Sequence, residues 1–157
     1  MAVVDVEARP TAVVAEATTW RDFPALWGQL SGEVWDCLRA SGIDRGCPNV
    51  MLYLDDVPHV EVGVLLTQPC PLTGRVVTSS LPAGRVATTV HQGSFGDVGA
   101  AHEAVVGWCR AQGLRLDRTR WEVYGQHHDD PEQQQTQVFW RVAPSEQAAG
   151  RAGVSVR

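Results

Sequence analysis

The sequence predicts a single α+β domain built from two βαββ repeats that pack about a pseudo-twofold axis. Two observations predict this fold. Strand-like and helix-like segments follow one another in the same order in each half of the chain, and a sequence match recurs at one fixed offset. Residues 39–43 (RASGI) match residues 110–114 (RAQGL) 71 positions later, and the same offset aligns residues 50–53 (VMLY) with 121–124 (WEVY). Repeats of this kind bury their apolar faces against each other.

The first repeat is predicted over about residues 11–67. Residues 11–18 form an apolar, valine-rich run that is typical of a strand. A helix follows, with Asp22 as its N-cap, Pro24 in its first turn and Gly42 at its end. Its apolar residues recur at spacings of three and four, which indicates one buried face: Phe23, Leu26, Trp27, Leu30, Val34, Cys37 and Leu38. Two further strands are predicted over 50–54 and 60–66, joined by a turn.

The second repeat is predicted over about residues 75–143. A hairpin joins strands over 75–80 and 85–91. The second helix begins near Ser94 or Asp97 and ends at Gly113. Strands over 121–125 and 136–142 complete the repeat, and the polar loop 127–135 links them.

The two ends of the chain lack the apolar pattern of a buried helix or strand. Residues 1–10 are expected to form a flexible N-terminus, and residues 144–157 a disordered tail of small and polar residues. The N-terminus lacks the basic and apolar regions of a signal peptide, and no apolar run is long enough to cross a membrane. We therefore expect a cytoplasmic protein with no membrane partner.

Charge and cysteine content exclude some classes of function. The net charge is −5 and the chain has no lysine, so a nucleic acid is not expected as a direct partner. Cys37 and Cys109 fall on helical core positions. Cys47 and Cys70 lie in turns, and the sequence leaves open whether they are paired.

Glu122 is the strongest candidate for a functional residue. It lies within a strand of strong β-formers, where alternate side chains share a face, so Glu122 and Tyr124 point the same way. A carboxylate in an apolar strand must face solvent, a partner or a cavity. An exposed, solvated glutamate and a cleft acid both fit the pattern, and the position near the repeat axis favours the cleft acid.

Aromatic residues are abundant enough to line such a cleft. Trp27 and Trp108 fit the core faces of the two helices. The remaining aromatic candidates for ligand binding lie at the helix starts and on the strands: Trp20, Tyr53, Phe95, Tyr124, Phe139 and Trp140. His91 fits either a core or a cleft position. Aromatic rings around a single carboxylate suit a lipophilic cation.

Metal and cofactor motifs are absent from the sequence. His102-Glu103 is not followed by the second histidine of a zinc-binding HExxH helix, and the cluster at 127–130 lies in a polar loop. No nucleotide-binding glycine motif or nucleophile elbow is present. We therefore expect no cofactor and no metal.

Several segments together resemble the GyrI-like small-molecule-binding domain over residues 11–142. These are residues 81–85 (LPAGR), 91–95 (HQGSF), 121–124 (WEVY) and 136–140 (TQVFW), in this order and spacing. The resemblance implies two βαββ modules of the SHS2 type, with an antiparallel sheet, two long helices and a central cleft. Such domains occur in AraC-type and BmrR-type regulators, where a buried glutamate meets cationic lipophilic drugs. That glutamate corresponds to Glu122.

The resemblance leaves three functions in competition. The first is a stand-alone module that holds a lipophilic or cationic small molecule for sensing or sequestration. The second is a hydrolase that opens strained electrophiles such as cyclopropanoid DNA-alkylating natural products, because some stand-alone members do so. Glu122 would then be the general base and Tyr124 the second catalytic residue. The third is an inhibitor that acts on another protein through the loop 127–135 or through an exposed sheet face. No helix-turn-helix precedes residue 11, so DNA binding by this chain alone is not expected, and a homodimer stays open.

Overall fold

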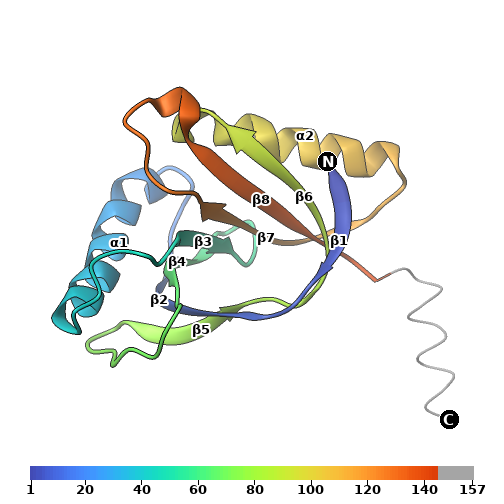
Figure 1. The fold of residues 1–157 in the computed structure, drawn as a ribbon. Helices are drawn as coiled ribbons and strands as arrows, with labels where there is room; N and C mark the ends of the chain where they lie inside the picture. The colour runs from blue at the N-terminus through green and yellow to red at the C-terminus, as the bar shows by residue number, and fades with distance from the viewer. Residues whose placement is uncertain (145–157) are drawn as a thin grey trace, which may run out of the picture.

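The computed structural model describes residues 1–144 and shows eight strands and two long helices (Figure 1). The strands are β1 (Ala2–Val6), β2 (Arg9–Ala17), β3 (Asn49–Tyr53), β4 (His59–Leu65), β5 (Val77–Leu81), β6 (Gly84–Gln92), β7 (Leu116–Tyr124) and β8 (Gln135–Val142). The helices are α1 (Phe23–Ala40) and α2 (Val98–Ala111), with short 3₁₀ turns at Phe95–Asp97 and Pro131–Gln133.

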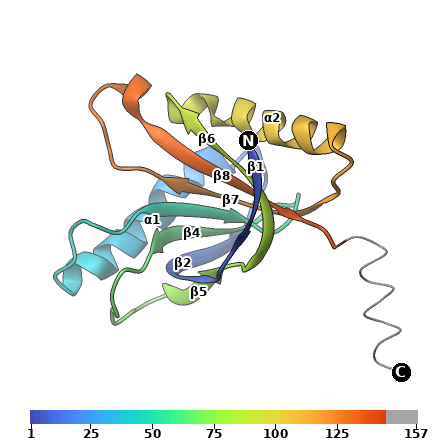
Figure 2. The same cartoon turned by 45° about the vertical axis from the view of Figure 1, so that its right-hand side comes forward.

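All eight strands form one antiparallel sheet in the order β1-β6-β8-β7-β3-β4-β2-β5. Both helices cover the same face of it. α1 packs on the valines of β2 and β4, and α2 packs through Val105 and Cys109 on Ala87 and Val138. The two helices lie over opposite ends of the sheet (Figures 1 and 2). The predicted α+β fold is confirmed.

The register of the two central strands locates the pseudo-twofold axis. Met51 on β3 pairs directly with Glu122 on β7, and these two residues are also repeat mates, 71 positions apart. A residue that pairs with its own mate lies on the symmetry axis. Glu122 therefore sits at the centre of the sheet, between the two helices.

The helix ends follow the repeat. Gly42 and Gly113 are repeat mates, and they take φ angles of +84° and +71° immediately after the C-cap residues of α1 and α2, Ser41 and Gln112. This left-handed conformation is accessible to glycine at little cost, so each helix ends just before its predicted glycine. At the start of α1, Asp22 is the N-cap but makes no side-chain capping bond, and the Thr19 hydroxyl accepts from the Asp22 N–H at 3.1 Å instead.

The other face of the sheet carries a second apolar core. The side chains that alternate with the helix-facing ones gather there: Val50, Leu52, Leu65, Leu81, Val86, Trp121, Val123 and Phe139. Gly63 allows β2 and β4 to approach closely, because a Cβ at this position would lie 1.9 Å from the Ala12 carbonyl oxygen. The close packing of β2 against β4 in the first repeat therefore depends on a glycine at this position.

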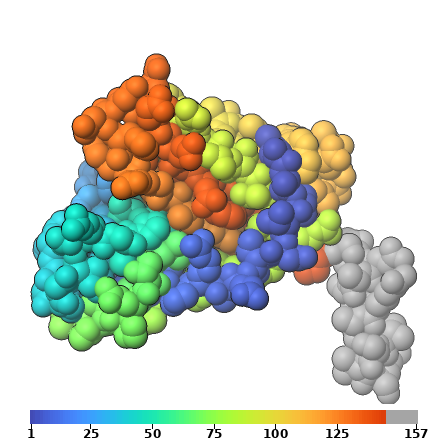
Figure 3. Space-filling view, in the orientation of Figure 1, coloured from blue at the N-terminus to red at the C-terminus, as the bar shows by residue number. Residues whose placement is uncertain are grey.

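The N-terminus differs from the sequence prediction. Residues 1–10 are not a flexible segment, because β1 pairs with β6 along residues 2–6 and β2 already begins at Arg9. β1 forms the edge of the sheet and lies on the surface (Figure 3). β7 begins five residues earlier than predicted, at Leu116. The disorder expected for 144–157 falls, apart from Pro144, outside the described residues.

Within residues 1–144, neither helix is long and apolar enough to cross a membrane. The four cysteines are free, including Cys47 and Cys70, whose pairing the sequence left open.

Candidate functional site

A cleft of about 490 Å³ opens between α1 and the start of α2, above the central strands. Its floor is formed by Met51 and Tyr53 of β3 and by Glu122 and Tyr124 of β7. Its walls come from the two helix starts, and repeat mates contribute to both walls, since Pro24 and Phe95 line it, as do Trp27 and Val98. The repeat therefore builds the cleft as well as the sheet.

Glu122 is the buried acid of this cleft, with a relative exposure of 2%. Among residues 1–144, three side chains contact its carboxylate. The Tyr53 hydroxyl lies 3.4 and 3.5 Å from its two oxygens, the Tyr124 hydroxyl donates a hydrogen bond to Oε2, and His102 Nε2 lies 2.8 Å from Oε1. The charge is thus held by hydrogen bonds in a place that water reaches poorly.

The two phenols are held in their protonated form. Burial, followed by the negative charge of Glu122, raises the pKa of Tyr53 and of Tyr124 well above the ordinary value. For Tyr53, the nearby positive charge of Arg120 opposes this shift. Both phenols therefore act as neutral donors to the carboxylate at physiological pH.

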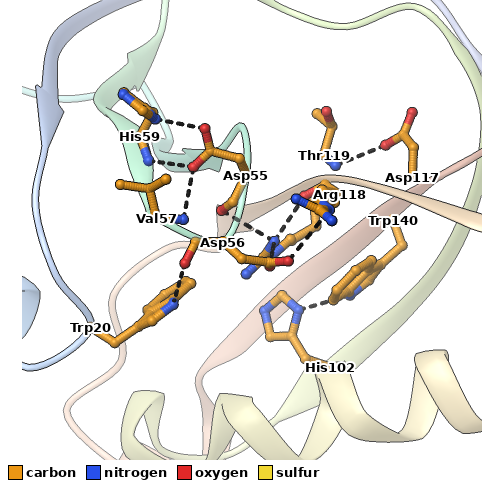
Figure 4. A network of polar contacts seen from close by, with 11 residues as sticks. Trp20, Asp55, Asp56, Val57, His59, His102, Asp117, Arg118, Thr119 and Trp140 are labelled. Carbon is orange, nitrogen blue, oxygen red and sulfur yellow. Dashed lines mark hydrogen bonds and ion pairs between the residues drawn. The ribbon is translucent and has the colours of Figure 1, made fainter.

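His102 reaches Glu122 from α2, and Trp140 of β8 supports it from behind. The Trp140 indole Nε1 donates to His102 Nδ1 at 2.9 Å, and the two rings meet at 72° (Figure 4). Glu122, His102 and Trp140 therefore form a chain of hydrogen bonds that links three elements of the second repeat.

Arg120 occupies an aromatic box beside the cleft. Its side chain is nearly buried, and the guanidinium carbon lies 5.3, 5.5 and 5.0 Å from the ring centres of Trp20, Tyr53 and Trp140. Its Nη1 donates to Asp56 Oδ1 at 2.9 Å and to the Arg118 carbonyl at 2.8 Å. The chain's own cation thus fills the space that these three rings enclose.

Four of the predicted site residues line the cleft: Glu122, Tyr124, Tyr53 and Phe95. Phe95 meets the Tyr124 ring edge-on at 5.0 Å. Trp20 and Trp140 lie outside the lining, on the Arg120 box, and Trp20 also donates to the Asp56 carbonyl (Figure 4).

Two predicted residues lie elsewhere. Phe139 stacks on Trp121 at 5.5 Å in the core of the opposite face, because its strand neighbour Trp140 takes the helix-covered face and successive side chains alternate. His91 Nε2 lies 2.9 Å from the Ser94 carbonyl oxygen, at the end of β6 and away from the cleft lining.

Sequence reasoning missed three residues of the site and misplaced a fourth. His102 was considered only as part of a zinc motif, Arg120 precedes the predicted strand, and Met51 was treated only as part of the repeat. Trp27, assigned to the helix core, is 42% exposed and lines the cleft. No local pattern marks His102: its repeat mate, Ser31, lines the cleft, but this is known only from the structure. Among the residues that the structure describes, no three His, Cys, Asp or Glu side chains are grouped closely enough to hold a metal ion.

Comparison with known proteins places this geometry in a family. The model of the GyrI-like small molecule binding domain matches residues 1–143. No curated protein sequence matches the chain. Solved structures are similar in fold. The EcmrR C-terminal domain has a TM-score of 0.70 at 16% identity, over 92% of this chain and 97% of that one.

Two further solved structures are similar in fold, and one is a ligand complex while the other is a hydrolase. SAV2435 bound to tetraphenylphosphonium has a TM-score of 0.64 at 13% identity, over 90% of this chain and 93% of that one. A hydrolase encoded by lin2189 from Listeria innocua has a TM-score of 0.58 at 14% identity, over 90% of this chain and 91% of that one. Identities this low show a shared fold.

Proposed function

Because this chain belongs to the GyrI-like small-molecule-binding family, we propose that it binds a lipophilic cation in the cleft, with Glu122 as the charged floor. The observation that carries the proposal is a buried carboxylate in an aromatic cleft of about 490 Å³. A cleft of this volume suits one drug-sized molecule, since ligand pockets span roughly 300 to 1,000 Å³.

The chemistry of the floor favours a cation. The two phenols that contact Glu122 are neutral donors, so they stabilise its charge without cancelling it. A carboxylate has about four lone-pair positions, which leaves capacity for a further electrostatic partner. The rings of Tyr53, Tyr124 and Phe95 add apolar surface and the attraction of their faces for positive charge. The tetraphenylphosphonium bound to SAV2435, which is similar in fold, belongs to the same ligand class.

Calorimetric titration of tetraphenylphosphonium and of the neutral triphenylphosphine oxide tests the proposal. A cation centred about 6 Å from the carboxylate gains about 3 kcal/mol at an effective dielectric constant of about 20, which corresponds to on the order of 100-fold in affinity. Glu122→Gln should therefore weaken binding of the phosphonium by one to two orders of magnitude and leave the neutral oxide nearly unchanged.

Glu103→Gln is the matched control, because it removes the same charge from an exposed position on α2. It should change neither affinity by more than about twofold, since exposed charges are screened. Equal losses for the cation and the neutral oxide in Glu122→Gln would contradict a charge-based role for this residue.

A hydrolase is the second candidate, and the direct hydrogen bond between Tyr124 and Glu122 at the cleft floor favours it. Glu122 would take a proton from water, and the resulting hydroxide would open a strained three-membered ring. The electron pair of the broken carbon–carbon bond would move to a conjugated carbonyl oxygen, which then takes up the proton. Product formation from a cyclopropanoid substrate over many turnovers, followed by mass spectrometry and abolished in Glu122→Gln, would establish this activity. Recovery of unchanged substrate would exclude turnover of that class of compound.

A further inference from the structure

The hydrogen bonds around His102 fix its tautomer. An indole N–H is a donor only, so the Trp140 Nε1 contact at 2.9 Å requires His102 Nδ1 to be an acceptor. A neutral imidazole carries its single proton on the other nitrogen in that case. His102 Nε2–H therefore donates to Glu122 Oε1 at 2.8 Å.

This arrangement also opposes a second proton on His102. The proton would have to sit on Nδ1, where it would point at the indole N–H, so that two donors would face each other. The guanidinium carbon of Arg120 lies 5.0 Å from the centre of the Trp140 ring. Its positive charge also disfavours a second positive charge on His102. In the part of the chain that the structure describes, Tyr53 of β3 and Tyr124 of β7 also contact Glu122, while Glu103 next to His102 on α2 is exposed.

We propose that Trp140 is a specificity-determining residue that keeps His102 a neutral donor, so that the cleft presents the uncompensated charge of Glu122 and prefers cations to neutral ligands. A histidine and a glutamate at 2.8 Å would otherwise be expected to share a proton as an ion pair. A protonated His102 would cancel the charge at the floor. Trp140 and His102 thus act through Glu122 and need not touch the ligand. The selectivity part of this inference rests on the proposed function.

The tautomer is measured first, without any ligand. Long-range ¹H–¹⁵N correlation NMR on ¹⁵N-histidine-labelled protein, with His102→Gln to assign the signal, should show an acceptor Nδ1 and a protonated Nε2. These shifts should stay constant between pH 8 and pH 6. In Trp140→Phe, the His102 shifts should move towards the doubly protonated form over this range. An imidazolium in the wild type at pH 7 would overturn the proposal.

Ligand selectivity is measured next, with tetraphenylphosphonium and triphenylphosphine oxide. In Trp140→Phe, affinity for the phosphonium should fall at least about tenfold between pH 8 and pH 6, while affinity for the oxide stays flat. The wild type should be flat for both ligands. Trp108→Phe is the matched control, because it removes an indole of α2 that packs against Val105 and Cys109, and it should behave like the wild type.

A double variant guards against a purely structural effect. Trp140→Phe/His102→Gln has no imidazole to protonate, so it should regain a flat pH profile, and His102→Gln alone should be flat. A pH-dependent loss that persists in the double variant, or a flat profile in a folded Trp140→Phe, would refute the role of Trp140. A wild type that binds no phosphonium would overturn the proposed function and the selectivity with it, while the NMR measurement would still decide the tautomer.

Discussion

Alkaline pH is expected to destabilise this protein mainly through Tyr53 and Tyr124. These are the two tyrosines of the chain, and both donate to Glu122. Burial and the Glu122 charge raise the pKa of both phenols in the folded state, whereas a tyrosine in an unfolded chain titrates near about pH 10. Above that pH the folded state binds more protons than the unfolded state. The stabilisation is fully present below about pH 10 and is lost as the pH rises.

The expected size of the effect follows from proton linkage. Each phenol that stays protonated in the folded state lowers the free energy of unfolding by about 1.4 kcal/mol per pH unit above about pH 10. The two together give about 2.7 kcal/mol per unit, a large share of the roughly 5–15 kcal/mol that stabilises a typical domain. The chain has no lysine, so no side-chain ammonium group titrates in the same window.

Urea unfolding between about pH 8 and pH 11.5 measures this slope, and tyrosinate absorbance reports ionisation directly. Tyrosinate should appear only as the protein unfolds. Tyr53→Phe and Tyr124→Phe should each remove about half of the slope above pH 10, and comparison with the wild type at the same pH cancels the contribution of the four thiols. Tyrosinate in the folded protein near pH 10, or unchanged slopes in both variants, would refute the proposed donor roles.

Two further predictions concern the scaffold. Gly63→Ala should cost at least about 3 kcal/mol in urea unfolding because its Cβ would meet the backbone of β2, whereas Gly107→Ala on α2, where a Cβ meets nothing within 4 Å, should be neutral or stabilise by up to about 1 kcal/mol. Leu30→Ala removes a fully buried side chain of α1 and should cost about 2–5 kcal/mol. Trp27→Ala should cost less stability than Leu30→Ala, because Trp27 is half-exposed, but should weaken phosphonium binding several-fold in the same titrations; the opposite ranking would show that Trp27 belongs to the core.

The fold was predictable because its signals are local and repeated. The spacing of Leu30, Val34 and Leu38 defines the buried face of α1, and two glycines at the same place in each repeat end the helices. The family resemblance is confirmed by the match over residues 1–143. β1 was missed because an edge strand carries little pattern of its own, and its partner β6 begins about 80 residues later in the sequence.

The site was predictable only in part, because side-chain direction depends on register. Glu122 and Tyr124 could be placed on one face from strand alternation alone. Phe139 and Trp140 are neighbours in sequence, and only the pairing of β8 with β7 shows that Trp140 takes the helix-covered face. Predicting that His102 belongs to the site would have required knowing where α2 crosses the sheet. Its hydrogen bond to Glu122 spans 20 residues and leaves no local pattern in the sequence.

The symmetry of the fold explains why the site has one carboxylate and two phenols. Glu122 and Met51 are paired repeat mates on the axis, so any residue on the axis lies within reach of Tyr53 from one repeat and of Tyr124 from the other. Two carboxylates in these paired positions would lie about 5 Å apart at their Cα atoms and would suppress each other's ionisation. Met51 avoids this repulsion. Its sulfur lies 3.5 Å from the Tyr53 hydroxyl and 3.7 Å from that of Tyr124, so it fills the symmetric position with a polarisable, uncharged group. A single carboxylate on the axis therefore requires the two repeats to differ at this pair, with Met51 in one and Glu122 in the other.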